Sequence, residues 1–173
     1  VGVLGPQGRG LAAALGLENQ VDLHMGTLSK SFGLSGGYLA ASRQVIDLLI
    51  NRSRSLIYST SPPPALAYAA VHALMLLSGQ EGNLRRDRLW SYLAILQSET
   101  PPASAILPKV IGDENQTLKV SAKLKSSGFL IPAIRYPTVS RGSARLRITC
   151  TAGHSRDQIE QLRAELQRLD QCD

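Results

Sequence analysis

The sequence has 173 residues with a formal net charge of +6, and 43% of the residues are apolar. This length allows one ordinary domain or somewhat more, and the apolar content is too high for a disordered chain. The longest apolar stretch, residues 65–77, is interrupted by His72 and is too short to span a bilayer. The basic residues are scattered and are not interleaved with aromatic ones, so we predict neither a membrane anchor nor a nucleic-acid-binding surface.

Two cysteines, Cys150 and Cys172, are too few for a disulfide framework, and no signal peptide is recognisable. We therefore expect a reducing location, either the cytosol or an organelle matrix, and predict the cytoplasm. The chain begins with Val1 and opens on a glycine-rich loop, residues 5–10, with no strand or helix before it. A self-contained domain seldom begins in this way, so we expect the C-terminal part of a longer protein.

Short strands and helices alternate in the first half of the chain. Ser42 is a suitable N-cap for a helix, and the helix expected over 65–77 is apolar nearly all round, which predicts that it is buried. Residues 38–41 are predicted to be a short buried strand. In chain order the expected elements are a helix over 11–15, strands over 21–25 and 38–41, a helix over 43–52, a strand over 56–61, and helices over 65–77 and 83–99.

The remaining residues predict a second, smaller α/β lobe. Its expected strands are 106–111, 129–134 and 144–150. Asp113 and Gln116 have the spacing of a capping box at the start of one helix, and Ser155 and Gln158 repeat it at the start of the last helix. We place the domain boundary between residues 79 and 80. Residues 1–79 are then the C-terminal part of a large domain, and 80–173 are a small C-terminal α/β domain.

A single lysine, Lys30, lies between small hydroxyl residues and a run of glycines, in the turn between two expected strands. A lysine amine that is partly desolvated is more often uncharged and can condense with an aldehyde. Thr27 and Ser29, with exposed backbone N–H groups in a glycine-rich turn, suit a phosphate. An aldehyde and a phosphate together suggest pyridoxal phosphate, although a solvated turn is the commoner meaning of such a pattern.

Arginines near the C-terminus are candidates for binding a carboxylate. Arg145 and Arg147 alternate with apolar residues in the strand over 144–150, so their side chains share one face. An arginine in this position is usually solvated, but its planar fork suits a substrate carboxylate better than lysine does. Arg135 follows the apolar strand over 129–134, which is where a binding residue would lie.

The run from residue 24 to residue 40, HMGTLSKSFGLSGGYLA, resembles the lysine segment of the α-oxoamine synthases. These are fold-type-I pyridoxal-phosphate enzymes that condense an amino acid with an acyl-CoA. Residues 133–139 and 142–149 are similar to the C-terminal signature of the family member that joins L-alanine to a pimeloyl thioester, on CoA or a carrier protein, in biotin synthesis. Residues 56–61 and 111–115 resemble the same member, so the resemblance covers nearly the whole chain.

This resemblance implies an α/β fold in which the chain is the C-terminal part of a fold-type-I transferase. It implies that Lys30 carries the cofactor, pyridoxal 5'-phosphate, and moves the α-proton of the amino acid. Thr27 would contact the cofactor phosphate. Ser59 and Thr60 would reach the phosphate of the neighbouring subunit's cofactor, which implies a homodimer.

The same resemblance implies a substrate site in the smaller lobe. Arg147 would hold the amino-acid carboxylate, and Arg135 and Thr138 would line the site. The substrates would be L-alanine and an acyl-CoA or acyl-carrier-protein thioester, and no metal ion is implied.

One departure from the family limits what the chain can do alone. The family has an Asp-x-Ala-His run just before the position of Val1, and its aspartate pairs with the pyridine nitrogen of the cofactor. We therefore expect the isolated chain to bind the cofactor poorly and to have little synthase activity. Two alternatives stay open: another α-oxoamine synthase, of the 5-aminolevulinate synthase or glycine C-acetyltransferase type, and a non-catalytic remnant that acts only as a dimerisation partner.

Overall fold

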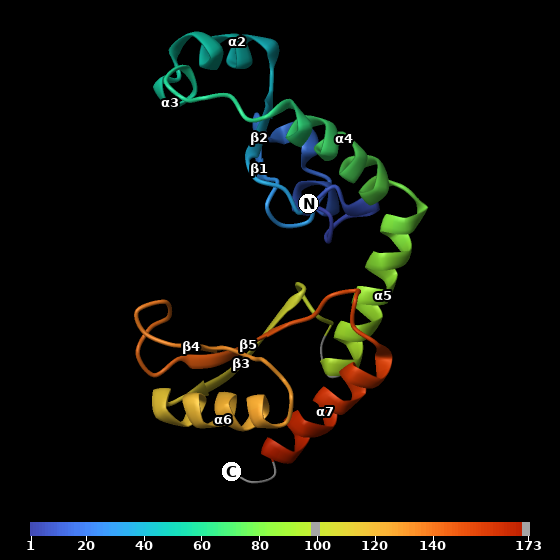
Figure 1. Ribbon diagram of the computed structural model, residues 1–173, viewed down its shortest axis with the longest axis vertical. Helices are drawn as coiled ribbons and strands as arrows, with labels where there is room; N and C mark the ends of the chain where they lie inside the picture. Colours follow the sequence, from blue (N-terminus) through green and yellow to red (C-terminus); the bar gives the residue numbers. More distant parts are fainter. Residues whose placement is uncertain (98–100, 171–173) are drawn as a thin grey trace. The chain divides into compact units, whose positions relative to one another are not determined.

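The computed structural model describes residues 1–97 and 101–170. The chain divides into two compact units, Val1–Leu84 (unit 1) and Arg85–Asp173 (unit 2). The division falls within the long helix α5 (Gln80–Leu96), drawn in light green in Figure 1. The boundary predicted between residues 79 and 80 stays a proposal. The predicted helix end at Glu99 and the second cysteine, Cys172, lie outside the described residues.

Unit 1 contains a two-stranded antiparallel sheet with helices before and after it. The strands pair with Gly26 opposite Tyr38 and Thr27 opposite Gly37. Its elements are η1 (Pro6–Gly8), α1 (Leu11–Ala14), η2 (Glu18–Gln20), β1 (Leu23–Thr27), β2 (Gly37–Ala41), α2 (Arg43–Arg52), α3 (Arg54–Ile57) and α4 (Pro64–Ser78).

The predicted helix over 43–52 is confirmed, and the predicted strand over 56–61 is wrong. Ser42 caps α2, its Oγ accepting a hydrogen bond from the Val45 N–H at 3.5 Å. The chain then forms the short helix α3, in which the Ser53 carbonyl accepts from the Ile57 N–H at 2.9 Å. A short apolar run fits a helix or a strand equally well in sequence. No strand of the described part of the chain pairs with this run, so local hydrogen bonds decide its conformation.

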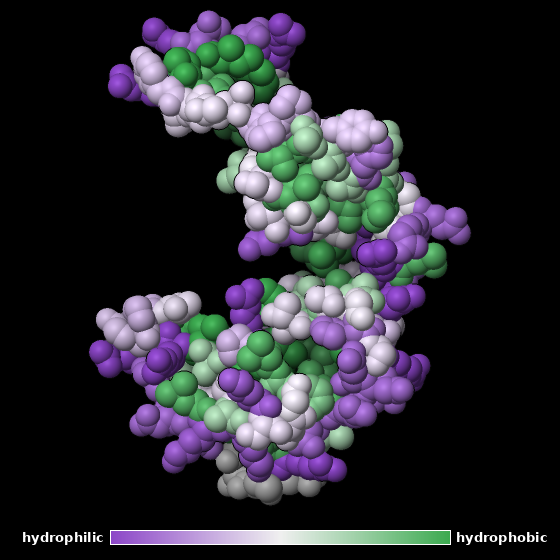
Figure 2. Space-filling view, in the orientation of Figure 1, coloured by the Kyte–Doolittle hydropathy of each residue, from purple (hydrophilic) through white to green (hydrophobic). Residues whose placement is uncertain are grey.

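The apolar side chains of unit 1 that the structure describes are either exposed or only partly buried. Among the described residues, every buried apolar side chain lies between Leu89 and Leu169, in unit 2. The helix α4 was expected to be buried, yet Tyr68 is 70% and Met75 64% exposed. The strand β2 is likewise mostly exposed rather than buried. Figure 2 shows apolar side chains gathered at the surface over α2, α3 and α4.

Unit 2 is a three-stranded antiparallel sheet packed on helices. The strand order is β3-β5-β4, and α6 packs against all three strands (Figure 1). Besides the C-terminal part of α5, its elements are β3 (Ile106–Gly112), α6 (Glu114–Ser126), β4 (Ala133–Ile134), β5 (Ala144–Thr149) and α7 (Arg156–Asp170). Among the described residues of the whole chain, no helix is both long enough and apolar enough to cross a membrane.

Capping residues set the starts of the helices in unit 2, as predicted. The Asp113 side chain accepts from the Gln116 N–H at 2.7 Å. At the start of α7 the exchange is reciprocal: the Gln158 N–H donates to Ser155 Oγ at 3.2 Å, and the Ser155 N–H donates to Gln158 Oε1 at 2.9 Å. Both patterns satisfy N–H groups that have no partner within the helix.

The strand predicted over 129–134 is much shorter in the structure. Only Ala133 and Ile134 form β4, opposite Leu146 and Arg145. The Phe129 N–H instead bonds the Leu124 carbonyl at 2.9 Å and so closes the end of α6. The residues before β4 are therefore used to end a helix, and only the last two join the sheet.

The core of unit 2 lies on the face of the sheet that carries Leu146 and Ile148, and α5, α6 and α7 all contribute buried side chains to it. Leu146, Leu124 and Leu93 are fully buried there. Cys150 is also buried, and burial raises the pKa of its thiol.

Replacing Leu146 by alanine should lower the free energy of unfolding of unit 2 by about 3 kcal/mol, because a fully buried leucine leaves a cavity that the sheet cannot close. Urea denaturation of the 173-residue chain, followed by circular dichroism, measures this loss. The matched control is Leu130→Ala, at a side chain that is 82% exposed, which should change stability by less than about 0.5 kcal/mol. Equal effects of the two substitutions would contradict the assignment of the core.

Candidate functional site

Lys30 lies in a well-defined turn between β1 and β2. The Leu28 N–H donates to the Gly36 carbonyl at 2.9 Å, and the Leu34 N–H donates to the Leu28 carbonyl at 2.8 Å. The Lys30 carbonyl accepts from the Gly33 N–H at 3.2 Å, and Gly33 has a φ of 66°, a conformation that glycine adopts without strain. The turn is thus held by its own backbone, as the glycine run predicts.

Hydroxyl groups surround the lysine within this turn. Thr27 Oγ1 accepts a hydrogen bond from the Ser29 N–H at 3.1 Å and lies 2.7 Å from Ser29 Oγ. Ser31 Oγ donates to the Val1 carbonyl at 2.8 Å, which ties the turn to the start of the chain. Thr27, Ser29 and Lys30 are all exposed. The described residues therefore present two hydroxyls and one amine on a single short turn.

The partial desolvation expected for Lys30 is not supplied by the described residues of this chain, because Lys30 is exposed. The reason is the absence of buried apolar side chains among the described residues of unit 1. No ion pair in the described part of the chain involves Lys30.

Tyr38 lies across Gly26, just before the lysine turn. A Cβ atom at Gly26 would lie 2.5 Å from atoms of the Tyr38 ring, so a side chain there would displace the ring. The two residues are cross-strand partners in the β1–β2 ladder. This close approach explains the need for glycine at the end of β1.

Ser59 and Thr60 lie in the exposed segment that follows α3, not in the strand that was predicted for them. The Ser59 N–H donates to the Leu56 carbonyl at 3.3 Å, and Ser59 Oγ makes a long contact of 3.5 Å to the Thr60 carbonyl. Among the described residues no hydrogen bond joins either hydroxyl to the lysine turn. Both side chains are exposed.

Arg145 and Arg147 share one face of the sheet, as predicted, and it is the face opposite the buried side chains of Leu146 and Ile148. Arg147 pairs in register with Pro108, and Arg145 pairs with Val110. Arg145 Nε donates to the Ser143 carbonyl at 3.0 Å, whereas the Arg147 side chain is exposed. Arg147 is therefore the arginine of β5 whose guanidinium group is presented to solvent and able to bind an anion.

Arg135 and Thr138 share one hydrogen-bonded turn directly after β4. The Arg135 carbonyl accepts from the Thr138 N–H at 2.9 Å and from the Val139 N–H at 3.3 Å. Residues 136–138 form the turn that these hydrogen bonds close. Both side chains are exposed. The shared turn brings these two predicted binding residues together in unit 2.

One contact in this loop was not predicted. The Arg141 guanidinium lies over the Tyr136 ring, 4.3 Å from its centroid. The signal in sequence is weak, because the two residues are five positions apart in a loop whose path is set by turns rather than by periodicity.

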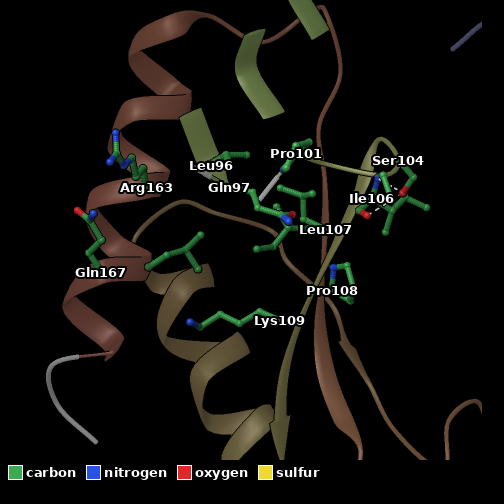
Figure 3. A pocket seen from close by; sticks show the side chains of 13 residues that line it. Leu96, Gln97, Pro101, Ser104, Ile106, Leu107, Pro108, Lys109, Arg163 and Gln167 are labelled. Carbon is green, nitrogen blue, oxygen red and sulfur yellow. Dashed lines mark hydrogen bonds between the residues drawn. The ribbon is translucent and has the colours of Figure 1, made fainter. Parts of the chain in front are cut away.

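A pocket of about 880 Å³ lies elsewhere in unit 2, between β3 and the helices α5 and α7. Figure 3 shows Leu107 and Lys109 on the strand side, with Arg163 and Gln167 on α7. None of the predicted site residues lines this pocket. A second pocket, of about 480 Å³, includes Arg147 in its lining.

The chain is similar to known proteins along nearly its whole length. The model of the family described as aminotransferase class I and II matches residues 1–166. The chain belongs to this family. It is 45% identical over 175 residues to an 8-amino-7-oxononanoate synthase from Acidithiobacillus ferrooxidans, an alignment that covers 97% of this chain and 44% of the relative. A synthase of the same name from Anaeromyxobacter dehalogenans is 40% identical, and the alignment covers 95% of this chain and 43% of that relative.

Two solved structures are similar to this chain over nearly its whole length. A serine palmitoyltransferase from S. paucimobilis, solved with bound PLP–myriocin, has a TM-score of 0.88 and 28% identity, covering 99% of this chain and 45% of that one. An 8-amino-7-oxononanoate synthase from Francisella tularensis has a TM-score of 0.82 and 25% identity, and the match covers 98% of this chain and 52% of that one. The predicted fold class and the resemblance to the α-oxoamine synthases are thereby confirmed. The chain spans about half the length of these relatives.

Proposed function

We propose that this chain supplies the C-terminal half of an 8-amino-7-oxononanoate synthase. The reaction joins the acyl group of pimeloyl-CoA, or of a pimeloyl carrier protein, to the α-carbon of L-alanine and releases the carrier thiol and carbon dioxide. The observation that carries this proposal is the lysine turn, in which Lys30 lies beside the hydroxyls of Thr27 and Ser29. The 45% identity to the Acidithiobacillus ferrooxidans synthase supports the choice of reaction.

The donor set of the turn fits pyridoxal 5'-phosphate. Lys30 offers the amine that the aldehyde of the cofactor requires, and Thr27 Oγ1 offers a hydroxyl donor to its phosphate. Ser59 and Thr60 are the further hydroxyls that we assign to the phosphate of the neighbouring subunit's cofactor in a homodimer. When bound, pyridoxal phosphate supplies an electron sink for the charge left on the α-carbon.

The side chains of this chain have separate tasks in the proposed reaction. Lys30 takes the α-proton of L-alanine at its ε-amine and later returns it, which requires a water-excluding cover over that amine. Arg147 holds the alanine carboxylate through two parallel N–H donors. Arg135 and Thr138 line the same substrate site from the turn after β4. We place this activity in the cytoplasm.

A chimera tests the proposal. It joins the part of the Acidithiobacillus ferrooxidans synthase that this chain does not match to Val1–Asp173. The chimera should restore growth without biotin to a bacterial strain that lacks its own synthase. With pimeloyl-CoA it should use L-alanine at least about tenfold better than glycine in kcat/KM, since one methyl group in a pocket is worth a factor of this size. A preference for glycine would favour another α-oxoamine synthase.

A second candidate is a non-catalytic partner chain. It is favoured by one observation, the absence of buried apolar side chains among the described residues of unit 1. On either reading we expect the isolated chain to bind pyridoxal phosphate poorly. An absorbance titration of the 173-residue chain with the cofactor measures this, and tight binding would contradict it. Failure of the chimera to restore growth, although it folds, would favour the non-catalytic reading.

A further inference from the structure

The loop between β4 and β5 is shaped by two consecutive turns. The first is the turn that begins at Arg135. In the second, the Ser140 carbonyl accepts from the Ser143 N–H at 3.2 Å and from Ser143 Oγ at 2.6 Å. Gly142, the third residue of that turn, has a φ of 74°, a conformation that L side chains rarely adopt. Arg141, the second residue, is therefore held in a defined backbone position.

The Arg141 side chain is also held in place. Its guanidinium lies over the Tyr136 ring at 4.3 Å from the centroid, and Tyr136 is 51% exposed. A guanidinium over the face of an aromatic ring is attracted to the ring electrons, and its planar set of N–H donors suits a carboxylate or phosphate, which it can bind through two parallel hydrogen bonds. A stacked arginine also loses less side-chain freedom when it binds.

The sequence around Arg141 is positively charged and contains no acidic residue that would balance this charge. Residues 115–155 contain seven lysines and arginines and no aspartate or glutamate. None of the ion pairs of the described residues involves Arg135, Arg141 or Arg147. The loop therefore presents an ordered cation without an acidic partner in the described structure, beside two residues of the proposed substrate site.

We infer that Arg141, stacked on Tyr136, receives an anionic group of the acyl thioester substrate. This inference rests on the proposed function and deepens it. Arg147 is assigned to the amino acid, so Arg141 is available to the second substrate. That substrate has oxyanions at two ends: the free carboxylate of the pimeloyl chain, and the phosphates of CoA or of the carrier's phosphopantetheine arm. The shared chemistry is recognition of an oxyanion by a preorganised guanidinium.

Equilibrium binding to the 173-residue chain, by isothermal titration calorimetry, tests the inference. The probes are pimeloyl-CoA, its monomethyl ester, which lacks the free carboxylate, and pimeloyl-N-acetylcysteamine, which lacks the phosphates. Arg141→Met should raise the Kd for pimeloyl-CoA about tenfold, and Tyr136→Phe, which keeps the stacking ring, should change it less than about twofold. Arg156→Met, which removes the same charge from α7, is the control and should have no effect beyond about twofold.

The probes distinguish the two ends of the substrate. If Arg141 binds the carboxylate, the substitution weakens binding of the N-acetylcysteamine thioester but not of the methyl ester. If Arg141 binds phosphate, the substitution weakens binding of the methyl ester but not of the N-acetylcysteamine thioester. Equal effects of Arg141→Met and Arg156→Met, no effect of Arg141→Met on any probe, or no saturable binding of pimeloyl-CoA by the unsubstituted chain would overturn the inference. The cofactor-binding role of Lys30 is measured separately, so these results do not depend on it.

Discussion

Replacing Lys30 by alanine in the chimera should lower kcat for the condensation of L-alanine with pimeloyl-CoA by at least about 10⁴-fold. In the proposed reaction this one amine both binds the cofactor aldehyde and moves the α-proton, and proton transfer by a positioned group alone is worth 10²–10⁴. A continuous assay of CoA release measures the loss. The proposed binding of the alanine carboxylate by Arg147 should survive, because Lys30 and Arg147 lie in different units of the chain.

The control for Lys30→Ala is Lys123→Ala, which removes an exposed lysine from α6 and should leave kcat within about twofold. Circular dichroism shows whether both variants fold. If Lys30→Ala folds and keeps more than a tenth of the activity, Lys30 is not the reacting amine, whatever the resemblance implies.

Amide hydrogen exchange of the isolated chain should differ sharply between the two units. We expect the amides of β5 to exchange at least about 100-fold more slowly than those of β1 and β2. The physical reason is that the buried apolar side chains of the described structure lie between Leu89 and Leu169, and burial of such side chains is what makes opening costly. Mass spectrometry of peptic peptides, with each rate divided by its intrinsic value, measures the difference.

The same experiment on the chimera provides the comparison. The first half of the relative should cover the exposed side chains of α4, such as Tyr68 and Met75, and protection of β1 and β2 should rise by at least about tenfold. Protection of β5 should hardly change. Equal protection of the two units in the isolated chain would show that unit 1 is stable without any cover.

Local signals in the sequence were sufficient for much of the fold. The cap at Ser42 and the reciprocal pair Ser155 and Gln158 predict helix starts because they act within one turn of the chain. The alternation in the strand over 144–150 predicts which face Arg147 occupies, because a strand has a period of two whatever it pairs with.

Features that depend on contacts with residues far away in the sequence could not be predicted from local patterns. The run over 56–61 forms α3 and a loop, and none of the strands in the described residues pairs with it. The apolar composition of α4 predicts burial, but burial also needs a second surface, and among the described residues the short helix η1 covers α4 only in part. The strand over 129–134 is shortened because Phe129 closes the preceding helix.

The candidate site also combines features that local sequence predicted with features that it did not predict. The glycine run and the resemblance located Lys30, and the structure adds the hydrogen bonds that form its turn. The contact between Arg141 and Tyr136 depends on two successive turns, which sequence periodicity does not report. The roles of Thr27, Ser59, Thr60, Arg135, Thr138 and Arg147 stay predictions.

The most direct test is to find which lysine of the chimera holds pyridoxal phosphate. Borohydride reduction fixes the cofactor to the amine that it has condensed with, and mass spectrometry of the digest identifies the modified peptide. We predict a single modified peptide, the one that contains Lys30. Modification of a peptide that contains Lys109 or Lys123 instead, with Lys30 unmodified, would contradict the proposed site.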